Sequence, residues 1–262
     1  MAGNMIELLS LNIGNPSLER AKKQCEWIVN RSEDIFVLTE TKNSQGCKYM
    51  EDFFMQYGYD LFSMGKGGAY YDVSFPKSKT NDLGVMIISK FPIIKSHHLF
   101  HEDSVYYPRQ LECEIEVGQK LIRVMGLYVP SRDRSDVKIE RKKIFIEKME
   151  KHLQKHGKET TIIMGDLNVL DRNHVPHYST FFEWEYRYYD HFIKEGFHDA
   201  FHLCHPGHQD YSWVGRTNDG YRYDYCFVSE NISSMVNRCD YIHETRKNKL
   251  TDHSAISVEI RN

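Results

Sequence analysis

The sequence predicts a fold of the α+β class, an α/β sandwich in which mixed β-sheets are covered by helices. Strand-like runs outnumber helical ones, and the two kinds alternate irregularly along the chain. The 262 residues contain no internal repeat, no low-complexity tract and no linker rich in Pro, Gly and Ser. We therefore expect residues 1–262 to form one domain.

Short runs rich in β-branched and aromatic residues predict the strands. In chain order these runs are 5–11, 35–39, 60–63, 84–89, 111–117, 121–129, 160–164, 222–228, 239–243 and 255–260. Periodicity and end signals predict helices at 18–30, 48–56 and 135–156. The last is the clearest, because apolar residues recur in it at helical spacing. They are Ile139, Phe145, Ile146, Met149 and Leu153.

Two stretches lack a regular pattern. Residues 64–80 predict a long surface loop, and residues 171–190 predict a second irregular stretch crowded with His and aromatic residues. Such loops are often functional, and disordered decoration is the open alternative. The basic residues of 135–156 are interpreted as a solvent-exposed helix face. The alternative is that they bind the phosphate backbone of a nucleic acid. They are Lys138, Arg141, Lys142, Lys143 and Lys148.

The bulk composition excludes several classes of protein. A net charge of −3 argues against a protein that coats nucleic acid, although an enzyme with a local basic rim remains compatible. No apolar run approaches membrane-spanning length, and the start of the chain lacks the pattern of a secretory signal. The six cysteines form no Cys-x-x-Cys pair, which predicts reduced thiols. We expect a cytoplasmic protein with no membrane partner and no obligate protein partner.

The most informative motif is Gly165-Asp166-Leu167-Asn168, which directly follows the apolar run 160–164. Alternation along an extended chain points the side chains of Asp166 and Asn168 the same way. A carboxylate and a carboxamide that face one spot can hold and deprotonate a water molecule. An Asx-rich turn after a strand is the alternative for this segment read alone.

Other strand-like runs also end or begin in polar residues, which suggests that one rim of the domain gathers a site. These residues are Asn12, Glu40, Tyr128, Asp166, Asp224, Asp252 and His253. If the carboxylates converge, each pair about 4 Å apart repels by roughly 4 kcal/mol at an effective dielectric near 20. A cation must offset this repulsion, and hard oxygen ligands favour Mg²⁺, Mn²⁺ or Ca²⁺. The pattern therefore indicates phosphate chemistry.

His253 adds a second theme, because a His can donate a hydrogen bond or a charge to a phosphoryl oxygen. Its other nitrogen then needs a carboxylate to fix the tautomer, and Asp224 is the candidate. Read in isolation, Asp252-His253 is also compatible with an exposed turn before a strand.

These motifs, taken in order, resemble the endonuclease/exonuclease/phosphatase superfamily, and most of all its exonuclease III and AP endonuclease branch. The matching pieces are 11–14, 39–42, 83–90, 128–130, 165–169, 196–201, 211–213, 221–225 and 251–254. The resemblance covers nearly the whole chain. It implies a four-layer sandwich of two mixed β-sheets packed face to face and flanked by helices. It also implies a Mg²⁺-dependent phosphodiesterase, with Mn²⁺ as an alternative ion.

The resemblance also implies a role for each matching position. The implied metal ligands are Glu40, Asn12 and Asp252, and the implied catalytic residues are Asp166, Asn168, His253, Tyr128 and Asp224. Asp166 would deprotonate the attacking water, and His253 would stabilise charge on the phosphorus centre. Arg222, Trp213 and Tyr221 would bind the substrate.

The leading hypothesis is a nuclease that acts on DNA, as an exonuclease or an AP endonuclease with a role in DNA repair. The alternative is a phosphatase or phosphodiesterase of the same superfamily that acts on a small-molecule or lipid phosphate, such as an inositol phosphate. The Trp-Cys-Asp-Arg signature of the inositol phosphatases is absent from the sequence.

Overall fold

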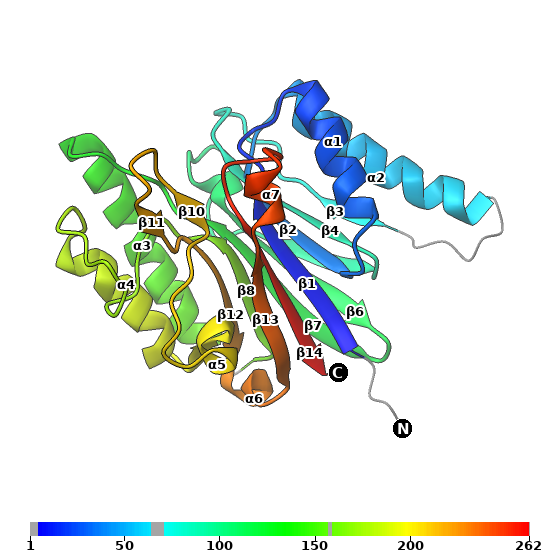
Figure 1. Cartoon of the computed structure of the whole chain (residues 1–262). Helices are drawn as coiled ribbons and strands as arrows, with labels where there is room; N and C mark the ends of the chain where they lie inside the picture. The colour runs from blue at the N-terminus through cyan, green and yellow to red at the C-terminus, as the bar shows by residue number, and fades with distance from the viewer. Residues whose placement is uncertain (1–4, 64–70, 157–158, 262) are drawn as a thin grey trace.

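The computed structural model describes residues 5–63, 71–156 and 159–261. Within these residues the chain forms two six-stranded sheets and one small two-stranded sheet. The two large sheets pack face to face, with one pair of long helices on each outer side (Figure 1). The predicted four-layer sandwich is therefore confirmed.

The first sheet has the strand order β13-β14-β1-β2-β4-β3. Its strands are β1 (Met5–Asn12), β2 (Ile35–Thr41), β3 (Asp72–Ser74), β4 (Gly84–Ser89), β13 (Val236–Ile242) and β14 (Ala255–Arg261). β1 and β2 are parallel, so the connecting helix α1 (Leu18–Val29) crosses over one face of the sheet. The other named neighbours are antiparallel. The sheet is mixed, as the sequence predicts.

The second sheet has the strand order β5-β6-β7-β8-β12-β9. Its strands are β5 (Ile93–His97), β6 (Gln110–Val117), β7 (Lys120–Tyr128), β8 (Thr161–Asp166), β9 (Phe197–Asp199) and β12 (Asp224–Ser229). A 3₁₀ turn, η1 (Tyr107–Arg109), leads into β6. β7 and β8 are parallel and are joined through the long helix α3 (Asp136–His156). Short elements complete the fold: α5 (Ala200–Cys204), β10 (Trp213–Val214), β11 (Gly220–Tyr221), α6 (Glu230–Ser233) and α7 (Glu244–Lys247).

Alternation of side chains along the strands builds three apolar layers. The layer between the sheets includes Leu8, Val37 and Val85 from one sheet and Val124 and Met164 from the other. Outside the first sheet, α1 and α2 (Gln45–Ser63) cover a second layer. Outside the second sheet, α3 and α4 (Glu183–Lys194) cover a third.

Two sequence predictions about the elements are wrong, and a third is confirmed only in part. Residues 60–63 are not a strand but the last turn of α2. The second irregular stretch contains α4, in which Glu185, Tyr188, Tyr189 and Phe192 are buried at helical spacing, so the aromatic cluster is partly core. The basic face of α3 is not fully solvated, because Lys142 is buried.

Part of the predicted 64–80 loop, residues 64–70, lies outside the described residues, and β3 occupies 72–74. The six cysteines are free thiols, as predicted. Among the described residues, no helix is both long and apolar enough to cross a lipid bilayer.

Candidate active site

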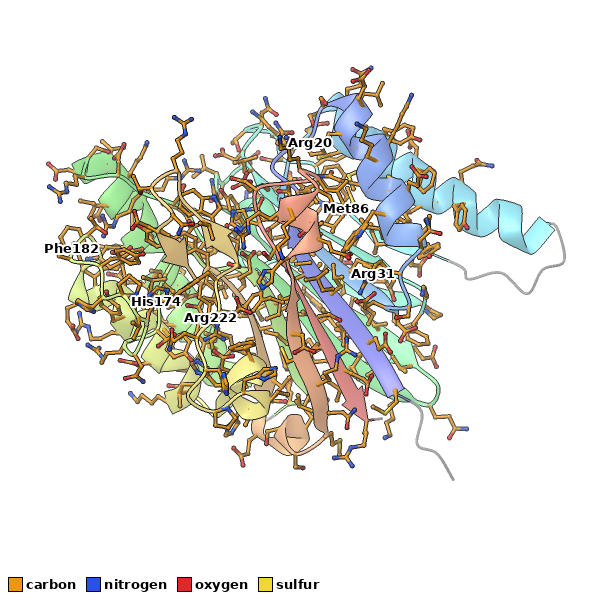
Figure 2. All side chains as sticks on the ribbon, viewed as in Figure 1. Arg20, Arg31, Met86, His174, Phe182 and Arg222 are labelled. Atoms are coloured by element: carbon orange, nitrogen blue, oxygen red, sulfur yellow. The ribbon has the colours of Figure 1, made fainter. Side chains whose placement is uncertain are left out.

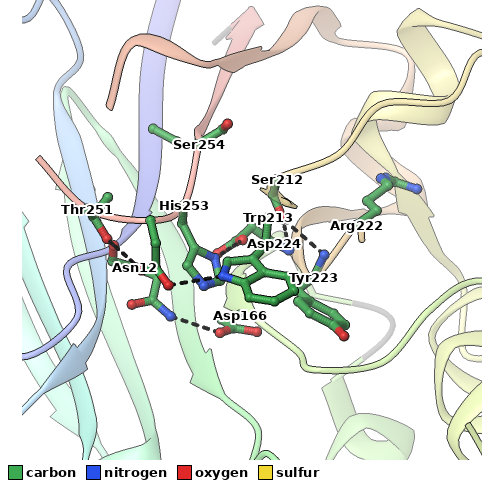
Figure 3. Close-up of polar contacts among 12 residues, drawn as sticks. Asn12, Asp166, Ser212, Trp213, Arg222, Tyr223, Asp224, Thr251, His253 and Ser254 are labelled. Atoms are coloured by element: carbon green, nitrogen blue, oxygen red, sulfur yellow. Dashed lines mark hydrogen bonds and ion pairs between the residues drawn. The ribbon is translucent and has the colours of Figure 1, made fainter. Parts of the chain in front are cut away.

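The predicted site residues meet at one end of the sandwich. β1 ends at Asn12, β7 ends at Tyr128 and β8 ends at Asp166. β12 runs antiparallel to β8 and starts there, with Asp224 paired to Asp166. β14 runs antiparallel to β1, so the residues that precede β14, including His253, reach the same end. Figure 3 shows Asn12, Asp166, Asp224 and His253 together at this end.

Asn12 hydrogen-bonds to two carboxylates, Glu40, the implied metal ligand, and Asp166, the implied base for the attacking water. Its Nδ2 donates to Asp166 Oδ2 at 2.9 Å and to Glu40 Oε1 at 3.1 Å. Its Oδ1 accepts from the backbone N–H of Gly14 at 3.0 Å. In this orientation Asn12 acts as a donor that holds two negative groups together, whereas the sequence predicts an oxygen ligand to a metal.

Glu40 is presented to the site by an irregularity in β2. Its φ is +55°, and the pairing of β2 with β4 shifts register between Thr39 and Thr41. This bulge turns the carboxylate toward the end of the sandwich, where the Tyr128 hydroxyl donates to it at 3.1 Å. Burial and the charge of Glu40 raise the pKa of the Tyr128 phenol. Tyr128 therefore remains a hydrogen-bond donor at neutral pH.

Gly165 explains how Asp166 reaches the site. Its φ is +143°, and a Cβ atom at this position would lie 2.0 Å from the carbonyl oxygen of Leu127. Only glycine fits this close approach of β8 to β7. The next side chain, Asp166, is consequently buried at the centre of the site.

The environment of Asp166 suits a proton acceptor. Burial, reinforced by the negative charge of Asp224, raises the pKa of the Asp166 carboxyl to about 8, although His253 opposes the shift. A carboxyl with a pKa near the working pH can accept a proton from water efficiently. This agrees with the general-base role that the sequence resemblance implies for Asp166.

Asn168 is fixed beside Asp166 with a left-handed backbone, at φ +49°. Its backbone N–H donates to Asp166 Oδ1 at 2.9 Å, and its Nδ2 donates to the carbonyl of Val129 at 3.1 Å. These bonds leave the side-chain oxygen of Asn168 as the group that can accept from a water molecule.

His253 and Asp224 form a buried pair, with Nδ1 of His253 2.7 Å from Asp224 Oδ2. Burial disfavours the charged imidazole, but the charge and hydrogen bond of Asp224, with Asp166 behind it, raise the pKa of His253 to about 10. Ser212 supports the pair, since its hydroxyl accepts from the Asp224 backbone N–H at 3.1 Å. His253 is thus a cation aimed at the same region as Asp166.

The rim of the site is aromatic. Trp213 Nε1 donates to Asp252 Oδ2 at 3.0 Å, and Trp213 also forms an isolated β-bridge with His253. The ring of Tyr221 lies 5.5 Å from that of Trp213 and stacks on Tyr223 at 5.2 Å. The predicted substrate-binding residues Trp213 and Tyr221 therefore stand at the mouth of the site.

Arg222 is different, because the structure does not bring it into the site. Its side chain is 1% exposed and points away from Asp166 and His253 (Figure 3). It lies in the crowded interior near α5 (Figure 2), where Nη2 contacts both carboxylate oxygens of Asp199 at 2.5 Å. Its Nε also donates to the hydroxyl of Tyr241 at 3.0 Å. Arg222 is a structural ion-pair residue, and the prediction that it binds substrate does not fit this geometry.

The donor set fits a hard divalent cation. Ligand atoms of Asp166, Asp224 and His253 lie within 4.8 Å of one another, close enough to hold an ion. A protonated His253 at that spot repels a cation, however, whereas Glu40 offers a carboxylate beside Asn12 and Tyr128. The residues present therefore fit a metal on the Glu40 side of the site.

A small cavity of about 160 Å³ opens beside Asn168. It is lined by Ser131, Arg132, Lys142, Asn168, Thr180, Phe181, Glu185, Tyr221 and Tyr223. Sequence reasoning missed Arg132, Lys142 and Glu185 as members of this region. A signal was present for two of them, because Lys142 and Glu185 each fall on the apolar stripe of a helix, at positions that predict burial.

The comparisons with known proteins agree with this geometry. The chain belongs to the Endonuclease/Exonuclease/phosphatase family, whose model matches residues 9–253. No curated protein matches the sequence.

Solved structures with the same fold include two proteins named for nuclease activity. An AP endonuclease from Archaeoglobus fulgidus has a TM-score of 0.79 and 22% identity, over 97% of this chain and 98% of that one. The 3'-5' exonuclease NExo from Neisseria meningitidis has a TM-score of 0.79 and 18% identity, over 98% and 100% of the two chains. The 3' phosphatase NExo from Neisseria, bound to product DNA hairpin, has a TM-score of 0.78 and 18% identity, over 97% and 99%. At these identities the likeness establishes a shared fold.

Proposed function

We propose that this protein is a divalent-metal-dependent phosphodiesterase that hydrolyses DNA, as an exonuclease or an AP endonuclease. One observation carries the proposal: Asp166 and His253, the carboxyl and the imidazole whose pKa values the site raises, are buried together near the strand ends that also present Tyr128 and Asn168. A phosphoester in this space would meet a base for the attacking water and a positive charge for the phosphoryl oxygens.

Each group has a definite task in that reaction. Asp166 takes a proton from the water whose oxygen forms the new bond to phosphorus, and Asn168 orients that water. His253 and Tyr128 donate to the phosphoryl oxygens, while the bond between phosphorus and the leaving oxygen breaks. Asp224 keeps His253 charged and correctly oriented. Together these residues supply positioning and electrostatic stabilisation.

The metal site that we propose centres on Glu40, with Asp252 at its edge and Asn12 beside it. Mg²⁺ suits the carboxylate oxygens of Glu40 and Asp252, and Mn²⁺ is the alternative. When bound, the ion would polarise a phosphoryl oxygen and neutralise part of the substrate charge.

DNA is the substrate class that the rim supports. Trp213, Tyr221 and Tyr223 form a run of aromatic rings at the mouth of the site, which suits stacking against bases or sugars. The structural neighbours carry names that refer to AP endonuclease, exonuclease and 3' phosphatase activity, one of them bound to DNA. We therefore propose a role in DNA repair, in a single-domain protein whose free thiols suit the cytoplasm.

The test is a cleavage assay with purified protein, Mg²⁺ or Mn²⁺, and a chelator control. The substrates are linear, nicked, abasic, 3'-phosphorylated and single-stranded DNA, RNA, and an inositol phosphate. We expect cleavage of DNA that requires the metal and is lost in Asp166→Asn. The matched control is Asp52→Asn, an exposed carboxylate on α2, which should cleave like the wild type. Phosphate release from the inositol compound alone, with every nucleic acid intact, would replace this proposal with the small-molecule alternative.

A further inference from the structure

A buried lysine lies directly behind Asn168. Lys142, on α3, is 1% exposed, and its Nζ contacts the backbone carbonyl of Asn168 at 2.6 Å. The same Nζ lies 2.6 Å from Glu185 Oε1 on α4. Burial lowers the pKa of the Lys142 amine, and the negative charge of Glu185 opposes this shift. The structure thus places a buried amine, paired with Glu185, between a helix of the outer layer and a residue of the active site.

Asn168 is held at three of its four polar groups. Asp166 holds its backbone N–H, Val129 holds its side-chain N–H₂, and Lys142 holds its carbonyl. The backbone of Asn168 is left-handed, a conformation that asparagine adopts more readily than other non-glycine residues. Lys142 bonds the backbone carbonyl of Asn168 and Asp166 bonds its backbone N–H, so the two together restrict the orientation of the residue and of its free side-chain oxygen.

Glu185 is the group that allows a lysine to be buried here. It is fully buried, and its second oxygen accepts from Arg132 and, at 2.9 Å, from the backbone N–H of Phe182. Despite burial, the charge of Lys142 and the hydrogen bond from Arg132 hold the pKa of Glu185 below its ordinary value. A carboxylate flanked by two cations compensates Lys142 and fixes the position of its ammonium group.

We infer that Lys142 is a positioning residue for catalysis, which acts through Asn168 and is itself positioned by Glu185. The inference rests on the proposed function for its effect on the reaction rate. Lys142 contacts Asn168 and does not reach the reacting atoms, so its effect on the reaction passes through Asn168. Loss of its charge should let the carbonyl of Asn168 rotate and the side-chain oxygen leave its position.

The first experiment compares Lys142→Met with the wild type and with Lys151→Met, which removes an exposed lysine from the same helix. We expect Lys142→Met to lower kcat by roughly tenfold or more, with KM nearly unchanged, because small misplacements of a catalytic group are costly. In an Asn168→Ala background, Lys142→Met should cause no further loss. An equal loss in both backgrounds would overturn the inference, since it would show an effect that does not pass through Asn168.

A second variant and a second measurement keep the test independent of folding and of activity. Lys142→Met/Glu185→Gln removes the charges of the buried pair and keeps a side-chain oxygen that can accept from Arg132 and from the Phe182 N–H, so it should fold and should show the same loss of kcat. Hydrogen exchange of the Asn168 amide should become roughly tenfold faster in both variants, with the β8 amides unchanged. Unchanged exchange at Asn168 in these variants would refute the inference, whether or not the wild type cleaves a substrate. A wild type that cleaves no substrate would by itself refute only the proposed function.

Discussion

Replacing Arg222 by Met tests whether this residue binds substrate or supports the fold. The variant leaves Asp199 buried without its cation and removes the partner of Asp171, which lies 3.6 Å from Arg222 Nη1. Breaking a buried ion pair from one side costs about 3–5 kcal/mol. For a chain of this length the entropy of unfolding is roughly 0.5 kcal/mol per degree, so Tm should fall by about 6–10 °C.

The pH dependence of this loss has a definite sign. Burial raises the pKa of Asp199, but Arg222 outweighs it and holds the folded pKa below the ordinary value. The stability from the pair is therefore present above the unfolded pKa of about 3.9 and is lost as the pH falls through the folded pKa. The difference in unfolding free energy between wild type and Arg222→Met should be largest near pH 7 and should shrink below about pH 4.

The assay combines urea unfolding across this pH range with cleavage kinetics at a temperature where both proteins are folded. We expect kcat and KM of Arg222→Met to stay within about threefold of the wild type, as for the exposed control Arg238→Met on β13. Asp199→Asn added to Arg222→Met should recover part of the lost stability, since it removes the unpaired charge. A tenfold rise in KM with wild-type stability would refute the structural role of Arg222.

Four further predictions follow from the site. Gly165→Ala should lower the free energy of unfolding by about 3 kcal/mol or more, because its Cβ would lie 2.0 Å from the carbonyl oxygen of Leu127. Thermal melts measure this, and a Tm within about one degree of the wild type contradicts it. Asp224→Asn should reduce kcat by about 10²–10⁴-fold with an intact fold, and retention of a tenth of the activity would exclude it as the orienting group. Glu40→Gln should raise the Mg²⁺ concentration needed for half-maximal cleavage. An unchanged concentration would show that Glu40 does not bind the metal. Trp213→Ala should raise KM for DNA by about 5–100-fold, and an unchanged KM would remove it from the rim.

The sequence was sufficient for the strand-end residues because each lies next to a short apolar run that predicts a strand. Asp166 follows a buried run and Asn12 ends one, so the edge of the sheet on which they lie can be inferred without coordinates. The bulge that turns Glu40 inward could not be inferred, since it depends on how β2 pairs with β4. The interior position of Arg222 depends likewise on Asp199, which is distant in sequence.

The short elements were beyond sequence reasoning for a different reason. β10 and β11 have two residues each, and their pairing places Trp213 beside Tyr221 through a turn with no strong strand signal. α4 was missed because its aromatic residues are typical of strands and loops, and its helical conformation comes from packing on α3 and the second sheet. Tertiary contacts therefore decided the elements that complete the rim.

Lys142 and Glu185 show which contacts a helical pattern predicts and which it does not. Lys142 precedes Phe145, Ile146 and Met149 on the buried stripe of α3, and Glu185 starts the equivalent stripe of α4. A charge on a buried stripe must be compensated, so two such stripes with opposite charges predict that the helices are neighbours and that the charges meet. The pattern cannot say what else the pair touches. That the carbonyl of Asn168 receives the lysine follows only from the loop after β8, whose left-handed residue directs this carbonyl outward to α3.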